Sequence, residues 1–160
     1  MSAYSTTQYI VEINVKEYKK ILIWSDGGSR GNPGPAGIGF VIKDSGNKLI
    51  YERGDVIGEA TNNIAEYSAV LEALKYVKKN IATSEINCMC DSELIVKQLR
   101  GEYKVKNAKL KQLFYDIRSK LMEVGANISF THVPRDKNER ADELYNKALE
   151  QKLGLHKSKK

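Results

Sequence analysis

Five short apolar runs, separated by turn residues and by segments of helical spacing, constrain the fold of this chain most strongly. The first run ends at Ser25-Asp26, and residues 27–37 that follow are so rich in Gly and Pro that we expect a loop. The next two runs flank residues 44–47 (DSGN), which are typical of a tight turn and predict a β-hairpin. All five runs favour buried strands. The predicted strands are residues 21–24, 38–42, 49–52, 86–90 and 128–133.

Apolar residues at helical spacing predict four helices between and after these strands. Ser92 and Asn138 are expected to be N-caps of the second and the fourth helix. The helices are expected over residues 64–79, 93–100 and about 110–121, and after Asn138. The resulting order is three strands, a helix, a strand, two helices, a strand and a helix. It predicts the α/β class, with a mixed five-stranded sheet in which a hairpin is extended by parallel strands and flanked by helices.

A chain of 160 residues has the size of one domain. We expect an N-terminal extension over residues 1–20, the main domain over residues 21–151 and a basic tail over residues 152–160. No apolar run approaches the roughly 20 residues of a membrane helix, and the N-terminus lacks the pattern of a secretory signal. Cys88 and Cys90 point to the same side of a predicted strand, which favours reduced core residues and a cytoplasmic protein. The alternative, a Cys-x-Cys metal pair, lacks a second pair of ligands.

The positive charge of this chain is concentrated in two segments. The net charge is +6, and residues 97–120 alone carry +6 while the tail 152–160 carries +4, which leaves −4 on the rest. Two basic segments on an acidic body are typical of proteins that bind a polyanion such as nucleic acid. The alternative is that both segments are solvated surface.

Four carboxylates stand where strands end or helices begin. Asp26 and Asp91 each follow a predicted strand, and ligands in open α/β sheets usually bind at that end. Glu66 lies in the first turn of its helix, and Asp142 lies early in the last helix. Each also has a structural interpretation, because Asp caps turns, Asn63 and Glu66 have capping-box spacing, and acids favour helix N-termini.

A cluster of these acids would suit phosphodiester hydrolysis. Two Mg²⁺ ions about 3.5–4 Å apart can stabilise both the attacking and the leaving oxygen, and Mg²⁺ prefers oxygen ligands. A Cys/His zinc set has no support, because His132 and His156 are the only histidines. Neither histidine accompanies a serine nucleophile motif.

At four places the sequence resembles the type-one ribonucleases H. The similar motifs come in the family's order, cover about residues 20–150, and are specific as a set. They are residues 26–34 (DGGSRGNPG), 61–66 (TNNIAE), 90–93 (CDSE) and 138–144 (NERADEL).

The resemblance implies a ribonuclease H-like fold and an endonuclease that cuts the RNA strand of RNA–DNA hybrids, leaving 5′-phosphate and 3′-hydroxyl ends. It implies that two Mg²⁺ ions, with Mn²⁺ as an alternative, bind to Asp26, Glu66, Asp91 and Asp142. It further implies that the hybrid is contacted by Asn32, Asn62 and Asn63 and that Thr61 helps to hold a DNA phosphate. We expect a monomer, and the sequence leaves open whether double-stranded RNA is cut as well.

The sequence departs from many bacterial members at three points. The basic segment 97–111 is short and lacks Trp, Glu93 replaces a Gln of some members, and the loop 134–137 lacks their histidine. The short loop is similar to that of the archaeal branch. Arg135 is the nearest strong phosphate donor in this loop, so it is a candidate substrate-binding residue. Two alternatives remain: a catalytically silent hybrid- or RNA-binding module, and a structural domain whose acidic pocket docks proteins.

Overall fold

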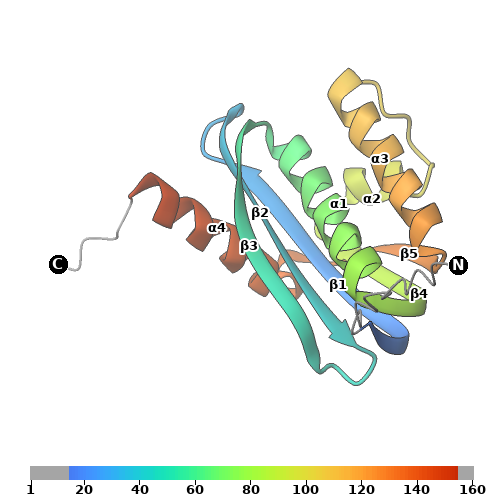
Figure 1. Cartoon of the computed structure of the whole chain (residues 1–160). Helices are drawn as coiled ribbons and strands as arrows, with labels where there is room; N and C mark the ends of the chain where they lie inside the picture. Colours follow the sequence, from blue (N-terminus) through green and yellow to red (C-terminus); the bar gives the residue numbers. More distant parts are fainter. Residues whose placement is uncertain (1–14, 155–160) are drawn as a thin grey trace, which may run out of the picture.

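The structure, a computed structural model, describes residues 15–154 and has one five-stranded sheet with four α-helices (Figure 1). The predicted extension therefore lies outside the described residues up to position 14, and the predicted tail lies outside them from position 155. The strands are β1 (Lys16–Ser29), β2 (Gly34–Asp44), β3 (Leu49–Ala60), β4 (Ile81–Cys90) and β5 (Asn127–His132). The helices are α1 (Asn62–Asn80), α2 (Glu93–Leu99), α3 (Ala108–Val124) and α4 (Glu139–Leu153), with a 3₁₀ turn at Arg135–Lys137.

The sheet is mixed, which confirms the predicted class. Its strand order is β3-β2-β1-β4-β5; β1 pairs antiparallel with β2 and parallel with β4, and β5 is parallel to β4. Trp24 pairs with Met89, two residues before Asp26 and Asp91 respectively. The carboxyl ends of β1 and β4 therefore bring these two acids to the same edge of the sheet.

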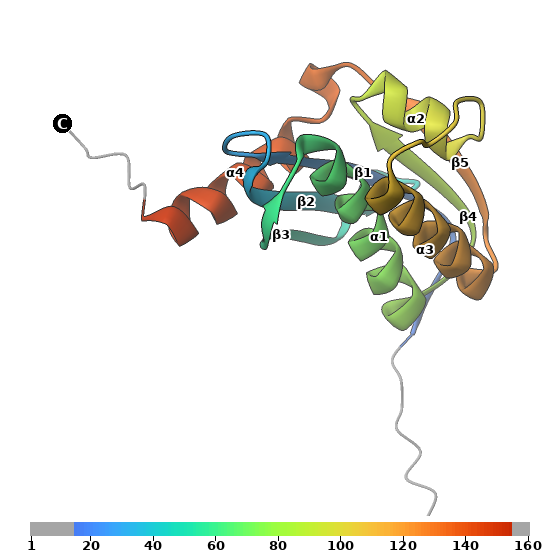
Figure 2. The same cartoon turned by 90° about the horizontal axis from the view of Figure 1, so that it is seen from above.

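The helices lie on both faces of the sheet. Helices α1 and α3 pack together on one face, whereas α4 lies across the other face over β2 and β3 (Figure 2). Within residues 15–154, no helix is long and apolar enough to cross a membrane.

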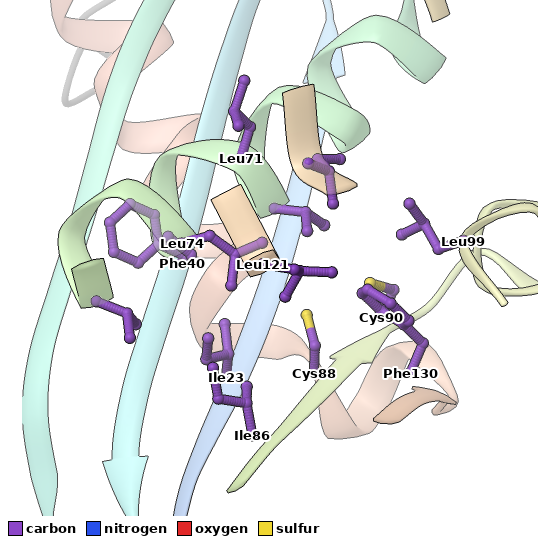
Figure 3. Close-up of a cluster of buried hydrophobic side chains, with 14 of the residues drawn as sticks. Ile23, Phe40, Leu71, Leu74, Ile86, Cys88, Cys90, Leu99, Leu121 and Phe130 are labelled. Carbon is purple, nitrogen blue, oxygen red and sulfur yellow. The ribbon is translucent and has the colours of Figure 1, made fainter. Parts of the chain in front are cut away.

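The main core lies between the sheet and helices α1 and α3 (Figure 3). The stripe predicted for α1 is fully inside, because Tyr67, Val70, Leu71, Leu74 and Val77 are all buried. Cys88 and Cys90 are buried free thiols of this core, as expected from the sequence.

The loop predicted for residues 27–37 is much shorter in the structure. Strand β1 continues to Ser29 and β2 begins at Gly34, so most of the glycine-rich segment is sheet. The prediction was wrong because most of these glycines serve close approach, whereas Gly31, with φ 89°, lies in the chain reversal itself. A Cβ atom on Gly27, for example, would stand 2.5 Å from the carbonyl oxygen of Ala65, so only glycine lets α1 pack this close to β1.

Helix α4 is positioned in the same way on the opposite face. Cβ atoms on Gly39 and Gly54 would collide with the backbone carbonyl oxygens of Ala141 and Leu144. Both strands therefore offer bare backbone on which the helix rests directly. This contact fixes the height and rotation of the helix that carries Asp142.

Candidate active site

Three carboxylates from three different elements converge at the end of the sheet. Asp26 lies on β1, Glu66 on α1, and Asp91 directly after β4. Carboxylate oxygens of these residues all lie within 4.8 Å of one another. The parallel pairing of β1 and β4 brings the two aspartates together, and the close packing of α1 on Gly27 adds the glutamate.

Asp142 lies in the first turn of α4 and faces the same space, although it is not part of the close trio. A cleft of about 500 Å³ opens in front of the four acids. Its lining residues are Asp26, Gly27, Gly28, Asn62, Glu66, Asp91, Arg135, Asp136, Glu139, Asp142 and Tyr145.

The concentration of negative charge changes the acidity of two members of the trio. Burial, followed by the nearby charge of Asp91, raises the pKa of Asp26 to about 8, although the N–H of Gly27 donates a 2.9 Å hydrogen bond to its Oδ1. Burial and Asp91 also raise the pKa of Glu66 to about 7, opposed by the positive charge of Arg135. Both shifts mean that ionised carboxylates here lack sufficient positive charge, which a bound cation would supply.

The donor set fits a divalent cation that prefers oxygen ligands. The Oε2 atom of Glu66 is buried and accepts no hydrogen bond from the described residues. Burying a carboxylate oxygen without a partner is costly, so an unused oxygen beside two other carboxylates is well suited to be a metal ligand.

The capping interpretation of Glu66 was wrong. The N-cap of α1 is Thr61, whose Oγ1 accepts a 3.2 Å hydrogen bond from the N–H of Ile64, and Asn63 lies inside the helix. A capping box over Asn63 and Glu66 is therefore excluded. The glutamate side chain is turned toward the two aspartates instead.

Two of the predicted substrate-binding asparagines link the loop after β1 to the start of α1. The Oδ1 of Asn62 accepts hydrogen bonds from the backbone N–H and the hydroxyl of Ser29, at 2.9 and 3.2 Å. The Oδ1 of Asn32 accepts a 3.1 Å hydrogen bond from the N–H of Asn62. Because both carbonyl oxygens are used inside the protein, the amide N–H groups are free to turn toward a ligand.

The predicted substrate-binding residues differ in whether they line the cleft. Asn62 and Arg135 line the cleft, whereas Asn32, Thr61 and Asn63 border Asn62 without lining it. Arg135 is in the 3₁₀ turn between β5 and α4, close enough to Glu66 to lower its pKa.

Comparison with known proteins gives the family. Residues 25–148 match the family described as reverse transcriptase-like. A ribonuclease HI of Halobacterium salinarum is 40% identical over 132 residues, which cover 82% of this chain. A ribonuclease H of a Sulfurovum species is 33% identical, and the match covers 79% of this chain and 88% of the relative. This chain belongs to the type-one ribonuclease H family. The motif resemblance is thereby confirmed.

Solved structures of ribonucleases H agree with this assignment. An RNase H1 isolated from compost by a metagenomic approach is 46% identical, with a TM-score of 0.78 over 84% of this chain and 99% of that chain. The RNase H1 of Halobacterium salinarum is 41% identical, also with a TM-score of 0.78, over 82% of this chain and 98% of that chain. The chain spans 65% of the curated Halobacterium relative and 36% of a matched bifunctional protein of Mycobacterium tuberculosis.

The sequence did not reveal the place of Asn138 in this site. It stands at the N-cap position of α4 but makes no side-chain cap hydrogen bond, so its predicted capping role was wrong. Its side chain is 2% exposed, and its Nδ2 donates to the carbonyl oxygen of Ser25 at 2.9 Å and to Oδ2 of Asp91 at 3.1 Å. Only the fold brings these groups together, so no local signal could have found the contact.

Tyr145 is a second residue that sequence reasoning missed. It follows Asp142 by three positions on α4, and this spacing was the available signal that both side chains share one face of the helix. Burial, together with the charges of Asp26 and Asp142, raises the pKa of its hydroxyl to about 12. The cleft therefore contains a protonated phenol beside its carboxylates.

Proposed function

We propose that this protein is an endonuclease that hydrolyses the RNA strand of RNA–DNA hybrids and leaves 5′-phosphate and 3′-hydroxyl ends. The observation that carries the proposal is the convergence of Asp26, Glu66 and Asp91 in an open cleft, with one glutamate oxygen buried and unpartnered. The compost RNase H1, 47% identical over 83% of this chain, has been crystallised in complex with an RNA/DNA hybrid. A silent binding module would not need such a costly group of acids.

We assign the catalytic cations to the four carboxylates of the cleft. Asp26, Glu66, Asp91 and Asp142 would hold two divalent ions, with Mg²⁺ as the physiological ion and Mn²⁺ as an alternative. When bound, the ions stabilise the charge that develops on the attacking and the leaving oxygen of the phosphodiester. The protein contributes the arrangement of the acids, because β1, α1 and α4 each supply one, Asp91 directly follows β4, and both helices are packed against the sheet.

The asparagines beside the acids would distinguish RNA from DNA. A 2′-hydroxyl both donates and accepts hydrogen bonds, and it is displayed in the wide minor groove of a hybrid. Asn62 lines the cleft, and Asn32 and Asn63 adjoin it, so their amides would meet the sugars near the scissile phosphate. Thr61, at the start of the same helix, would contact a phosphate of the DNA strand.

Arg135 would bind a phosphate beside the carboxylates. It lines the cleft, and its charge already acts on Glu66 in the free protein. A guanidinium binds phosphate oxygens in a bidentate manner, which suits it to draw the cleaved phosphate away from the acids.

We further propose that the protein acts as a monomer in the cytoplasm, where its free thiols Cys88 and Cys90 would stay reduced. Double-stranded RNA is a second candidate substrate, because its cleaved strand carries the same 2′-hydroxyls.

The proposal is tested with one labelled RNA sequence presented as a hybrid, as duplex RNA and as a single strand, and with a duplex DNA of the same sequence. The proposal predicts rapid internal cleavage of the hybrid RNA in Mg²⁺, no cleavage in EDTA and no cleavage of the duplex DNA. It also predicts products that polynucleotide kinase cannot label until the 5′-phosphate is removed. Hybrid binding without cleavage would instead favour the silent module.

A further inference from the structure

The cleft has few groups that can receive a nucleic-acid strand, which makes each hydrogen-bond donor in it informative. Six of its eleven lining residues are acids, and a phosphodiester carries negative charge of its own. Among the other lining side chains, donors come from the amide of Asn62, the guanidinium of Arg135 and the hydroxyl of Tyr145. The function proposed above uses the first two and leaves the third without a role.

The position of Tyr145 is fixed from two sides. Its helix rests on bare strand backbone, where a Cβ atom on Gly39 would stand 3.0 Å from the backbone nitrogen of Tyr145. Its ring covers Gly28 of β1, where an added Cβ would stand 2.9 Å from the phenolic oxygen and 3.1 Å from two ring carbons. The tyrosine thus forms a rigid part of the cleft wall, with its hydroxyl two residues along β1 from Asp26.

The chemistry of this wall favours a contact with phosphate. A phenol is uncharged, so it can stand beside Asp26 and Asp142 without joining the metal-binding set. It is a hydrogen-bond donor, and bonds to an ionised acceptor are about twice as strong as those between neutral groups. The side chain of Asp142 is one acceptor within its reach, and a phosphate oxygen brought in by the substrate is a second. A half-buried side chain needs little rearrangement to turn its hydroxyl from one to the other.

We propose that Tyr145 is a substrate-binding residue whose hydroxyl donates a hydrogen bond to a phosphate oxygen of the RNA strand next to the scissile position. This inference rests on the function proposed above for the same cleft. It adds a contact on the α4 wall, so that the strand is held by donors on both sides of the carboxylates: Asn62 on the α1 side and Tyr145 on the α4 side.

The test begins with Tyr145→Phe, which removes only the hydroxyl and keeps the ring over Gly28. The matched control is Tyr18→Phe, another half-buried tyrosine near the opposite end of β1. We expect Tyr145→Phe to raise KM for the hybrid about tenfold with little change in kcat or in the Mg²⁺ concentration for half-maximal rate, and the control to match the wild type. An unchanged KM would overturn the proposal. A change confined to the Mg²⁺ concentration for half-maximal rate would also overturn it, and would show that Tyr145 acts only through Asp142.

A second measurement identifies the acceptor and does not depend on cleavage. The measurement uses hybrids with a single neutral methylphosphonate at successive RNA positions and a parallel set with single 2′-deoxy sugars. Fluorescence anisotropy gives their affinity for two Asp91→Asn proteins, one with Tyr145 and one with Tyr145→Phe. A methylphosphonate at one position should weaken binding to the Tyr145 protein about tenfold, so that its affinity equals that of the Tyr145→Phe protein. If a 2′-deoxy position does so instead, or none does, the phosphate contact is wrong. Failure of the wild type to cut any hybrid would contradict the proposed function, while this binding comparison would still decide the role of Tyr145.

Discussion

The Nδ2 atom of Asn138 lies 3.1 Å from Oδ2 of Asp91 and 2.9 Å from the carbonyl oxygen of Ser25, so one buried amide links the ends of β1 and β4 to the start of α4. These three elements carry three of the four proposed metal ligands. The hydrogen bond also holds the carboxylate of Asp91, whose oxygens lie within 4.8 Å of carboxylate oxygens of Asp26 and Glu66. We therefore regard Asn138 as a positioning residue for the carboxylate cluster.

Replacing Asn138 tests this role. Asn138→Ala leaves a buried carbonyl and one carboxylate oxygen without their donor, which should cost about 1–3 kcal/mol of folding stability. It should also raise the Mg²⁺ concentration needed for half-maximal cleavage severalfold. Asn138→Asp should have a larger effect on Mg²⁺ dependence, because it places a second carboxylate against Asp91. Urea unfolding in EDTA and Mg²⁺ titrations measure the two effects, with Asn87→Ala of β4 as the control; loss of stability without any change in Mg²⁺ dependence would show a purely structural role.

The raised pKa values of Asp26 and Glu66 predict how the metal-free protein responds to pH. The unfolded acids lose their protons near pH 4, whereas in the folded protein they hold them until about pH 8 and about pH 7. Between these limits the folded state binds more protons than the unfolded state, so the free energy of unfolding falls as pH rises. In EDTA, Tm should therefore decline from pH 5 to pH 8.

Asp26→Asn should make this decline shallower, and saturating Mg²⁺ should stabilise the wild type more at pH 8 than at pH 5. Parallel Tm curves for the wild type and Asp26→Asn would mean that the aspartate is not buried in a cluster of like charge.

Arg135→Ala should lower the turnover number about tenfold while leaving hybrid affinity nearly unchanged. The physical reason is that a phosphate produced beside the acids loses its guanidinium partner. Single-turnover and steady-state rates on the hybrid separate cleavage from product release, and Lys137→Ala, in the same 3₁₀ turn, controls for general loss of positive charge. A wild-type turnover number would exclude the role.

The asparagines should set the preference for hybrid over duplex DNA. A donor or acceptor left unpaired costs about 1–3 kcal/mol, so Asn63→Ala should reduce hybrid cleavage about tenfold or more. Asn62→Ala should lose at least as much, because its side chain lines the cleft and accepts hydrogen bonds from Ser29. Rates on hybrid and duplex DNA of one sequence provide the measurement, and comparable cleavage of both by the wild type would contradict the account.

The sequence was sufficient for the class of fold because its strongest patterns are local. Apolar runs and helical spacing depend on neighbouring residues, so the element order and the mixed sheet could be predicted. The ends of the strands could not be predicted, because a glycine there can indicate either a loop or close packing. Gly27 was predicted to lie in a loop, but it lies in β1 against the carbonyl of Ala65. Only the packing of two distant segments decides between them.

The same distinction applies to the site. Asp26 and Asp91 could be expected together because their strands end alike and a crossover makes them neighbours. The roles of Asn138 and Tyr145 could not be expected, since one depends on contacts 113 and 47 residues away and the other on the bare backbone of Gly28. Asn63 was assigned a cap that Thr61 provides, because helix starts are uncertain by a residue or two when read from sequence.

The central claim is that the carboxylate cluster is a metal-dependent hydrolytic site, and the cleavage rate of Asp91→Asn on a labelled hybrid in Mg²⁺ tests it most directly. Asp55→Asn, which changes an exposed aspartate of β3, is the matched control. We expect the cluster variant to lose at least three orders of magnitude in rate, to bind Mg²⁺ more weakly in calorimetry and to keep or exceed the wild-type Tm in EDTA, while the control cleaves normally. A wild-type rate for Asp91→Asn would contradict the account.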